Sequence, residues 1–285
     1  MELFVNVACL QLDCLPRQKE SNLSKALTFA QQAVVKGANL LVLPELFTTS
    51  IVYSSREELY ADAEPIPGGA TTRALAEFCK SNAVYLTGSW IEQDGGKLYN
   101  TAALLGPEGY LGKYRKTHLC DEEFLWFEPG DLGYPVFHTK LGRIALLICL
   151  DSYYPETFRL CAMKQADIVC LPTNWAGRDA PGPYPTPGPV LCIAGALSNH
   201  LFVAAANRVG QAGTLSYPGC SILSGPTGAV EAQAQTRGEE LVLARLNLAQ
   251  ARRKNIDCYN ARLANRRTDL YDPWLGYRPE TVDKP

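Results

Sequence analysis

Short continuous apolar runs alternate along the chain with longer stretches whose apolar residues recur every three or four positions. Runs of the first kind are typical of strands buried on both faces, and stretches of the second kind are typical of amphipathic helices. This pattern predicts strands over residues 4–11, 40–43, 84–90, 99–105, 143–148, 168–171, 201–206, 221–224 and 241–246. It predicts helices over residues 21–36, 71–80, 156–164 and 191–199.

Capping and turn residues support several of these elements. Ser21 or Asn22 is expected to cap the first helix, Gly37 to end it, and Pro155 to start the third. Gly-rich turns follow residue 93 and residue 224. Alternating helices and buried strands favour an α/β fold in which helices cover the sheets.

One short segment has a similar copy, here called its echo, in the second half of the chain. Residues 38–44 read Ala-Asn-Leu-Leu-Val-Leu-Pro, and residues 166–172 read Ala-Asp-Ile-Val-Cys-Leu-Pro. Each copy follows a predicted helix and contains a buried strand that ends at proline. The match favours two related α–β halves, although links from helices into strands often look alike.

Composition narrows the class of protein. The chain has 285 residues, a formal net charge of -2, 47% hydrophobic residues and 20% charged residues, as in ordinary globular proteins. This balance gives no reason to expect binding to nucleic acid or to an anionic membrane. No apolar run reaches the roughly 18 residues of a membrane span, and no secretory signal is visible.

Ten cysteines are present, and none forms a CxxC pair. Several, such as Cys9 and Cys170, lie inside apolar runs. We therefore expect a cytoplasmic protein whose thiols are reduced and mostly buried in the core. A reactive cysteine requires an argument of its own.

Two segments carry candidate acid–base groups. Glu45 directly follows a buried strand, where desolvation raises the pKa of a carboxylate and suits it to proton transfer. A cap or turn carboxylate is the alternative. Residues 114–119 read Tyr-Arg-Lys-Thr-His-Leu. Lys116 in this segment is a candidate active-site cation, although such charges are usually exposed to solvent.

The third segment carries a candidate nucleophile. Cys149 lies where the apolar run 146–148 ends and a turn begins, followed by Leu150 and Asp151. A thiol at such a corner can face a cleft while backbone N–H groups beyond it point into the same space. A nearby base and cation would then activate it. Taken alone, Cys149 is equally well explained as a core residue.

Together these segments resemble the nitrilase superfamily of carbon–nitrogen hydrolases. The matching pieces are Leu43-Pro44-Glu45, residues 114–119, Ile148-Cys149-Leu150-Asp151 and Pro155-Glu156, in that order. Glu123, six residues before Pro129, resembles the second active-site glutamate of the family. The likeness extends from the first strand to about Tyr271.

The resemblance implies a four-layer α-β-β-α sandwich of two β-sheets covered by helices, in which Glu45, Lys116 and Cys149 converge at strand ends. It implies a hydrolase domain over residues 1–271 and a C-terminal tail, residues 272–285, packed on the surface or on a partner subunit. It also implies homodimers or larger homo-oligomers, joined partly through the helix after Cys149, and chemistry that needs no metal or organic cofactor.

The sequence lacks the motifs of other classes of hydrolase. A Ser-His-Asp hydrolase would need a G-x-S-x-G elbow, and the three histidines are scattered. A zinc hydrolase would need H-E-x-x-H or paired cysteines. A non-catalytic binding or scaffold protein on this fold remains the alternative from another class. We assign Asp151 a structural role in the turn after Cys149, and His118 a role in orienting the active-site strand.

The residues after the nucleophile bear on the substrate. Nitrile-hydrolysing members of the family place an aromatic residue and then Glu after the cysteine. Leu150-Asp151 resembles the amidase and carbamoylase branch instead. The sequence therefore predicts a small-molecule amide as substrate, with carbamoyl compounds and nitriles as alternatives. The expected oxyanion-binding and substrate-binding residues are Leu150, Tyr153, Tyr154, Asn174 and Arg178.

Overall fold

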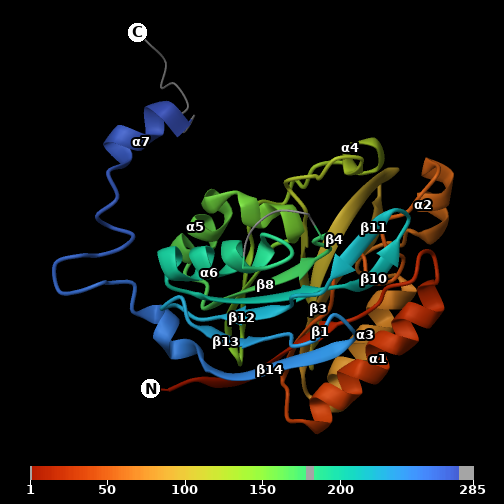
Figure 1. Cartoon of the computed structure of the whole chain (residues 1–285), viewed down its shortest axis with the longest axis horizontal. Coiled ribbons are helices and arrows are strands. Elements are labelled where there is room, and N and C mark those ends of the chain that lie inside the picture. Colours follow the sequence, from red (N-terminus) through yellow and green to blue (C-terminus); the bar gives the residue numbers. More distant parts are fainter. Residues whose placement is uncertain (1, 178–182, 276–285) are drawn as a thin grey trace. The chain divides into compact units, whose positions relative to one another are not determined.

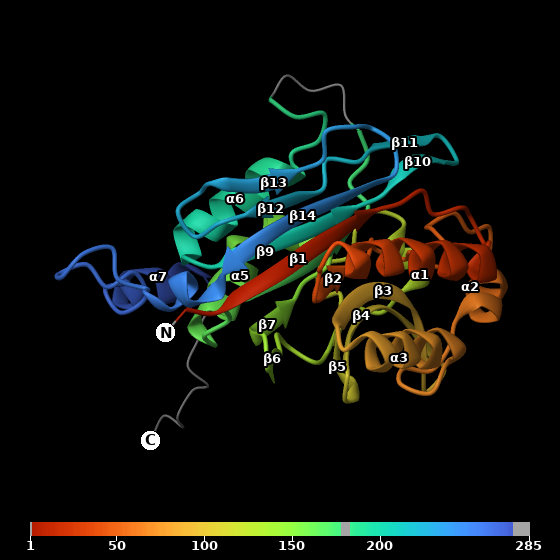
Figure 2. The same ribbon diagram turned by 90° about the horizontal axis from the view of Figure 1, so that it is seen from below.

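The computed structural model describes residues 2–177 and 183–275, and it divides into two compact units, residues 1–252 and 253–285. The first unit contains two six-stranded sheets and a separate two-stranded sheet. Helices α1 (Lys19–Val35) and α3 (Ala70–Asn82) lie on the outer face of the first large sheet. Helices α5 (Pro155–Met163) and α6 (Gly188–Asn199) lie on the outer face of the second (Figure 1 and Figure 2). The four-layer α-β-β-α sandwich is thus confirmed.

The strands are arranged as follows. The first sheet has the order β14 (Glu240–Asn247), β1 (Phe4–Gln11), β2 (Leu40–Val42), β3 (Tyr85–Asp94), β4 (Lys97–Gly106) and β5 (Gly109–Arg115). The second has the order β13 (Val230–Gln233), β12 (Ile222–Ser224), β9 (Phe202–Asn207), β8 (Ile168–Thr173), β7 (Gly142–Leu146) and β6 (Val136–Thr139). The two-stranded sheet is a hairpin of β10 (Val209–Ala212) and β11 (Leu215–Pro218).

Burial on both faces explains the continuous apolar runs of the central strands. In β1, Ala8 and Leu10 pack in one core cluster with residues of α1 and α3. Cys9 lies near Cys170 of the second sheet and, like it, is fully buried. Strands between two covered faces need apolar residues at successive positions rather than at alternate ones.

The echoed segments occupy equivalent places in the two sheets. Strand β2 pairs in parallel with β1 and β3, as β8 pairs in parallel with β7 and β9. The backbone N–H of Asn39 donates to the carbonyl of Asn6 at 2.9 Å, and that of Asp167 donates to the carbonyl of Arg143 at 2.8 Å. The two α–β halves predicted from the echo are present as structural counterparts.

The first helix begins earlier than predicted. It starts at Lys19 after Gln18, so neither Ser21 nor Asn22 caps it. Asn22 is buried, and its side chain bonds the backbone of Leu15 and the carbonyl of Thr48 instead. Gly37 ends the helix as expected, with a φ of +87°.

Other elements were not predicted because their patterns are weak. Strand β13 is mostly exposed and is held by pairing with β12. The others are β5, β6, the β10–β11 hairpin, α2 (Arg56–Asp62), α4 (Glu123–Trp126), the 3-10 helices Cys149–Tyr153 and Leu248–Arg252, and α7 (Thr268–Leu275).

The second unit contains α7, so the tail expected from Asp272 starts inside a helix. Its packing stays a prediction. Within the described ranges, no helix combines the length and the apolar character that a membrane crossing would need.

Candidate active site

Three ionisable side chains, two at strand ends and one at the start of a short helix, form one buried cluster. Glu45 follows β2, Lys116 follows β5, and Glu123 lies at the start of α4. The Lys116 Nζ lies 2.7 Å from the Glu45 Oε1 and 2.5 Å from the Glu123 Oε2. All three side chains are essentially inaccessible to solvent, so the cation is compensated by two carboxylates inside the protein.

Asn100 on β4 fixes the two carboxylates relative to each other. Its Nδ2 donates to the Glu45 Oε1 at 2.8 Å and to the Glu123 Oε1 at 3.1 Å. Its Oδ1 accepts from the hydroxyl of Ser89 at 2.9 Å. The backbone N–H of Cys120 donates to the Glu123 Oε2 at 2.7 Å. Such a network limits side-chain rotation within the cluster.

Cys149 joins this cluster at the end of β7, as the first residue of the short 3-10 helix. It is 8% exposed, and its backbone has a φ of +44°, which is unusual for a residue with a side chain. The thiol bonds the Glu45 carboxylate and accepts a hydrogen bond from the backbone N–H of Asn174. The sulfur therefore lies directly beside a potential base.

The protonation behaviour follows from burial and charge. Burial raises the pKa of Glu45, while Lys116 opposes that rise. Burial lowers the pKa of Lys116, but Glu123 and Glu45 outweigh it and raise that pKa well above its usual value. Burial and the charge of Glu45 raise the pKa of Cys149 well above its usual value. These shifts favour the protonated thiol of Cys149, and Glu45 lies beside it as a possible proton acceptor.

A cavity of about 420 Å³ opens onto the cluster. The described residues that line it include Glu45, Lys116, Glu123 and Cys149. Its other walls come from the 51–53 segment, the 120–122 turn, the 174–176 segment and the β10–β11 hairpin. The cavity is large enough for a small molecule and brings it against the sulfur.

The expected substrate-binding residues lie in different places relative to the cavity. Leu150, Tyr153 and Asn174 line the cavity. Tyr154 is not among the described lining residues, so its role in substrate binding stays a prediction. The chain becomes extended at Tyr154, and its ring stacks on His118 with 3.7 Å between centroids. Arg178 lies outside the described residues.

Several site residues were missed in the sequence. Asn100 could have been found, because it is a polar residue in the otherwise buried stretch 98–106. Trp175 follows Asn174 at the end of β8, and its ring packs so closely on Gly188 that a Cβ there would meet ring atoms at 2.2 Å. Tyr217 lies on the β10–β11 hairpin, which has no strong strand pattern.

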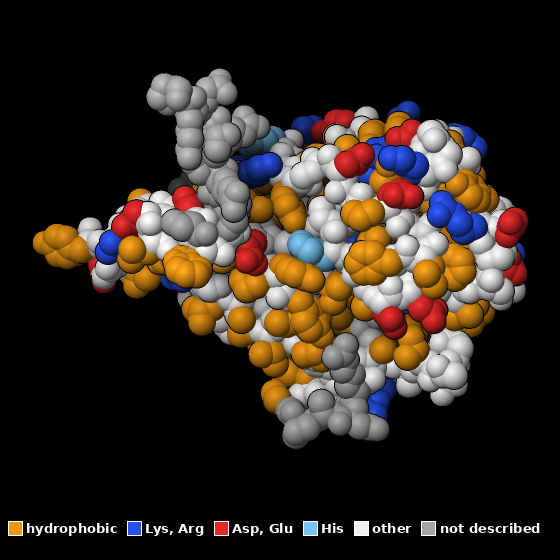
Figure 3. Space-filling view, turned by 90° about the horizontal axis from the view of Figure 1, so that it is seen from above, with side chains coloured by type: hydrophobic (Ala, Val, Ile, Leu, Met, Phe, Trp, Pro, Cys, Tyr) orange, Lys and Arg blue, Asp and Glu red, His pale blue; other side chains and the backbone are white. Residues whose placement is uncertain are grey.

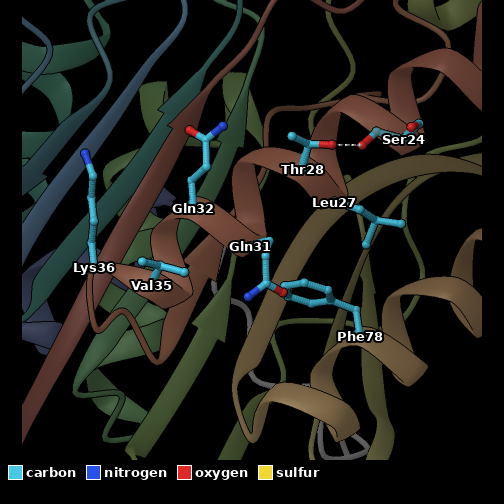
Figure 4. Close-up of a pocket in the computed structure, with 8 residues that line it drawn as sticks. All are labelled: Ser24, Leu27, Thr28, Gln31, Gln32, Val35, Lys36 and Phe78. Carbon is cyan, nitrogen blue, oxygen red and sulfur yellow. Dashed lines mark hydrogen bonds between the residues drawn. The ribbon is translucent and has the colours of Figure 1, made fainter.

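A second hollow lies on the outer face of the first layer, between α1 and α3 (Figure 4). Its lining residues are Ser24, Leu27, Thr28, Gln31, Gln32, Val35, Lys36 and Phe78. Lys36 is the single ionisable group among them, and no nucleophile with a base lies there. Over the described ranges, no group of three His, Cys, Asp or Glu side chains is arranged to hold a metal ion.

Comparisons with known proteins show the family of the chain. A family model described as carbon-nitrogen hydrolase matches residues 6–255. The chain is 36% identical to a nitrilase of Pyrococcus abyssi, covering 94% of this chain and 99% of that protein. It is 30% identical to an N-carbamoylputrescine amidase of Solanum lycopersicum, covering 94% and 93%.

A solved structure is similar over nearly the whole chain. It is a glutamate-to-glutamine variant of an amidase from Nesterenkonia sp. AN1, with a TM-score of 0.77 and 27% identity, covering 95% of this chain and 96% of that chain. In that variant the acetamide moiety of fluoroacetamide is covalently added at the active-site cysteine.

Proposed function

The chain belongs to the carbon–nitrogen hydrolase family, in the amidase and carbamoylase branch of the nitrilase superfamily, and from that premise we propose that it hydrolyses small neutral amides through a thioester on Cys149. The observation that carries the proposal is the buried Glu45, Lys116 and Cys149 cluster at the base of a cavity. The enzyme is a hydrolase that acts on non-peptide C–N bonds.

Acylation begins with proton transfer from the Cys149 thiol to Glu45, which the thiol already bonds. The sulfur attacks the carbonyl carbon, and the carbonyl oxygen becomes negative. Lys116 and the backbone N–H of Leu150 stabilise that oxygen; one such donor is commonly worth roughly 3–4 kcal/mol. Glu45 then gives the proton to the leaving nitrogen, and ammonia or an amine departs.

Deacylation uses the same base. Glu45 takes a proton from water, the hydroxide attacks the thioester carbonyl, and the thiol of Cys149 leaves with the proton from Glu45. The carboxylic acid is released. Glu123 also pairs with Lys116, at 2.5 Å, and in this proposal it orients the substrate nitrogen.

A carbamoyl amine is the second candidate substrate, favoured by the similarity to N-carbamoylputrescine amidases. A nitrile is less well supported, because Leu150-Asp151 follows the cysteine. Neutral amides and carbamoyl amines give different products. Assaying the purified protein against neutral amides, carbamoyl compounds and nitriles for ammonia, carbon dioxide and acid would distinguish them, and no turnover on any C–N substrate would contradict the proposal.

The charge of the cavity argues for neutral substrates. Among the described lining residues, Lys116 is the single cation, and it is already compensated by two carboxylates. Asp121 and Glu122 also line the cavity and are exposed. A substrate carboxylate would enter without a free partner, and an unpaired buried charge is costly.

We therefore predict that a neutral short-chain or aromatic primary amide is cleaved at least about tenfold better than its ω-carboxylated analogue, about 1.4 kcal/mol in transition-state binding. The measurement is kcat/KM for the matched pair. A tenfold preference for the carboxylated compound would mean that a cation such as Arg178 enters the cavity. Arg178→Ala should then reverse that preference, and a failure to reverse it would exclude Arg178.

Replacing Lys116 with alanine is expected to lower kcat by about 10²- to 10³-fold, as for the loss of one oxyanion donor. It should also move the acid limb of the pH–rate profile to higher pH, because Lys116 lowers the pKa of Glu45. Lys113→Ala, on the strand that precedes Lys116, is the control, since Lys113 pairs with Glu92 outside the cavity. Near wild-type kcat in Lys116→Ala would exclude the oxyanion role.

The outer face of α5 and α6 is the proposed contact with a second copy. Met163, Val190 and Leu197 are each about half exposed there, at 47%, 45% and 45%. Figure 3 shows hydrophobic side chains gathered on this side of the molecule. Covering them with the same face of another chain would remove apolar surface from water. The molar mass in solution, measured by light scattering, tests this assembly.

A further inference from the structure

One buried carboxylate connects the segment that carries Lys116 to the turn that carries Cys149. Asp151 is fully buried and lies outside the described lining of the cavity. Its carboxylate accepts hydrogen bonds from both sides. The donors are Tyr114 Oη at 2.7 Å, Thr117 Oγ1 at 3.0 Å, His118 N at 3.2 Å, His118 Nδ1 at 2.8 Å and Ile148 N at 2.9 Å.

This connection matters because the sheets do not supply it. Lys116 follows β5, the edge strand of the first sheet, and Cys149 follows β7 of the second. No strand ladder joins β5 to β7. The relative position of Lys116 and Cys149 therefore depends on side chains, and Asp151 bonds both segments from outside the cavity lining.

The backbone at the nucleophile also requires support. A residue with a side chain at a φ of +44° is in a strained conformation, which persists where its surroundings determine it. Asp151 makes two hydrogen bonds to Ile148, the residue before Cys149. Its carboxylate accepts from the N–H of Ile148, and its own N–H donates to the Ile148 carbonyl at 3.0 Å. The Ser152 hydroxyl donates to the Cys149 carbonyl at 2.7 Å.

His118 extends the same connection to the start of α5. Its Nδ1 lies 2.8 Å from the Asp151 Oδ1, and its ring stacks on Tyr154 at an interplanar angle of 12°. The imidazole ring thus lies nearly parallel to the Tyr154 ring, and its Nδ1 faces the Asp151 carboxylate. This agrees with the structural roles expected for Asp151 and His118, and it gives them a specific purpose.

We propose that Asp151 is a positioning residue, which holds Cys149 in its strained conformation and fixes the sulfur relative to Lys116. The inference rests on the proposed function, since it assigns Asp151 an effect on the attack by Cys149. Loss of the carboxylate lets the turn relax away from the Lys116 segment. The sulfur then loses its alignment with the carbonyl carbon and its contact with Glu45, while the cavity walls that bind substrate stay in place.

The test compares Asp151→Asn with Asp167→Asn. Asp167 is an equally buried carboxylate before β8, at the far end of the strand from Asn174, where it pairs with Arg143 and Arg252. Both variants should lose thermal stability. Asp151→Asn should lower kcat by about 100-fold with KM changed less than about threefold, since small misplacements of reacting groups have effects of this size. Asp151→Asn should also slow the alkylation of Cys149 by iodoacetamide. In Asp167→Asn, the rate of this alkylation should stay within about twofold of wild type.

A variant Asp151→Asn that lost only thermal stability, with kcat and alkylation within about twofold of wild type, would overturn the proposal. If this variant does not fold, Tyr114→Phe and His118→Phe each remove one hydrogen bond to the carboxylate. Each should then slow alkylation, and unchanged rates in both would overturn it. If wild type hydrolyses no amide while Asp151→Asn still slows alkylation, the proposed function fails and the positioning role stands.

Discussion

Cys149→Ala is expected to reduce amide turnover to background, a loss on the order of 10⁴- to 10⁶-fold, as when a covalent nucleophile is removed from a catalytic triad. Its sulfur is the single nucleophile beside the Glu45 carboxylate among the described residues of the cluster. Without it, water would have to attack the amide directly. The measurement is kcat by ammonia release, with circular dichroism to confirm folding.

Three other cysteines provide matched controls. Cys120→Ser changes a half-buried thiol that lines the same cavity, and it should retain most of the activity. Cys9→Ala and Cys170→Ala change fully buried core thiols, and they should lower the melting temperature without abolishing turnover. Loss of activity in Cys120→Ser with activity retained in Cys149→Ala would transfer the nucleophile to Cys120.

Glu45→Gln is expected to have the second largest effect, because one group serves both half-reactions. A general base or acid contributes about 10²- to 10⁴-fold to a step, so the variant should lose acylation and deacylation together. Glutamine retains an acceptor for Asn100 but cannot take the proton of Cys149. A kcat within about tenfold of wild type would exclude Glu45 as the base.

The ionisation of Glu45 determines how activity should change with pH. Glu45 must be ionised to act as the base, and burial raises its pKa. Wild-type activity should therefore rise with pH through an inflection above the ordinary glutamate value of about 4.3. Glu64→Gln, at a buried carboxylate paired with Lys19 outside the cavity, should keep this inflection.

Labelling with fluoroacetamide shows whether Glu45→Gln is inactive because it lacks the base or because its site is disrupted. The similar amidase carries the acetamide moiety on its cysteine even when a glutamate is replaced by glutamine. Labelling of Cys149 in Glu45→Gln would therefore show that the nucleophile and its cavity remain intact. A variant that neither turns over nor labels would point to a disrupted cavity.

The sequence was informative wherever burial imposes a strong pattern. Strands such as Phe4–Gln11 are buried on both faces, so their apolar runs identified them. Glu45 and Cys149 were found because polar or reactive residues directly follow such runs. The echo at Ala38 and Ala166 worked for the same reason, since both copies enter a buried central strand.

What could not be predicted depends on contacts across the fold. The start of α1 was misplaced because Asn22 bonds a distant loop rather than its own helix end. The role of Asn100 depends on two carboxylates from other segments. Tyr153 and Tyr154 were both expected to bind substrate through their aromatic rings, and Tyr153 lines the cavity while the ring of Tyr154 stacks on His118.

The central claim is that a thioester forms on Cys149. Its most direct measurement is peptide mapping by mass spectrometry after acid quench during turnover of an activated ester, whose rapid acylation makes deacylation rate-limiting and lets the intermediate accumulate. The account predicts a mass increase of one acyl group on the peptide that contains Cys149, decaying as the acid is released. An acyl group on Cys120 or another residue, or hydrolysis with no covalent species at any time point, would contradict it.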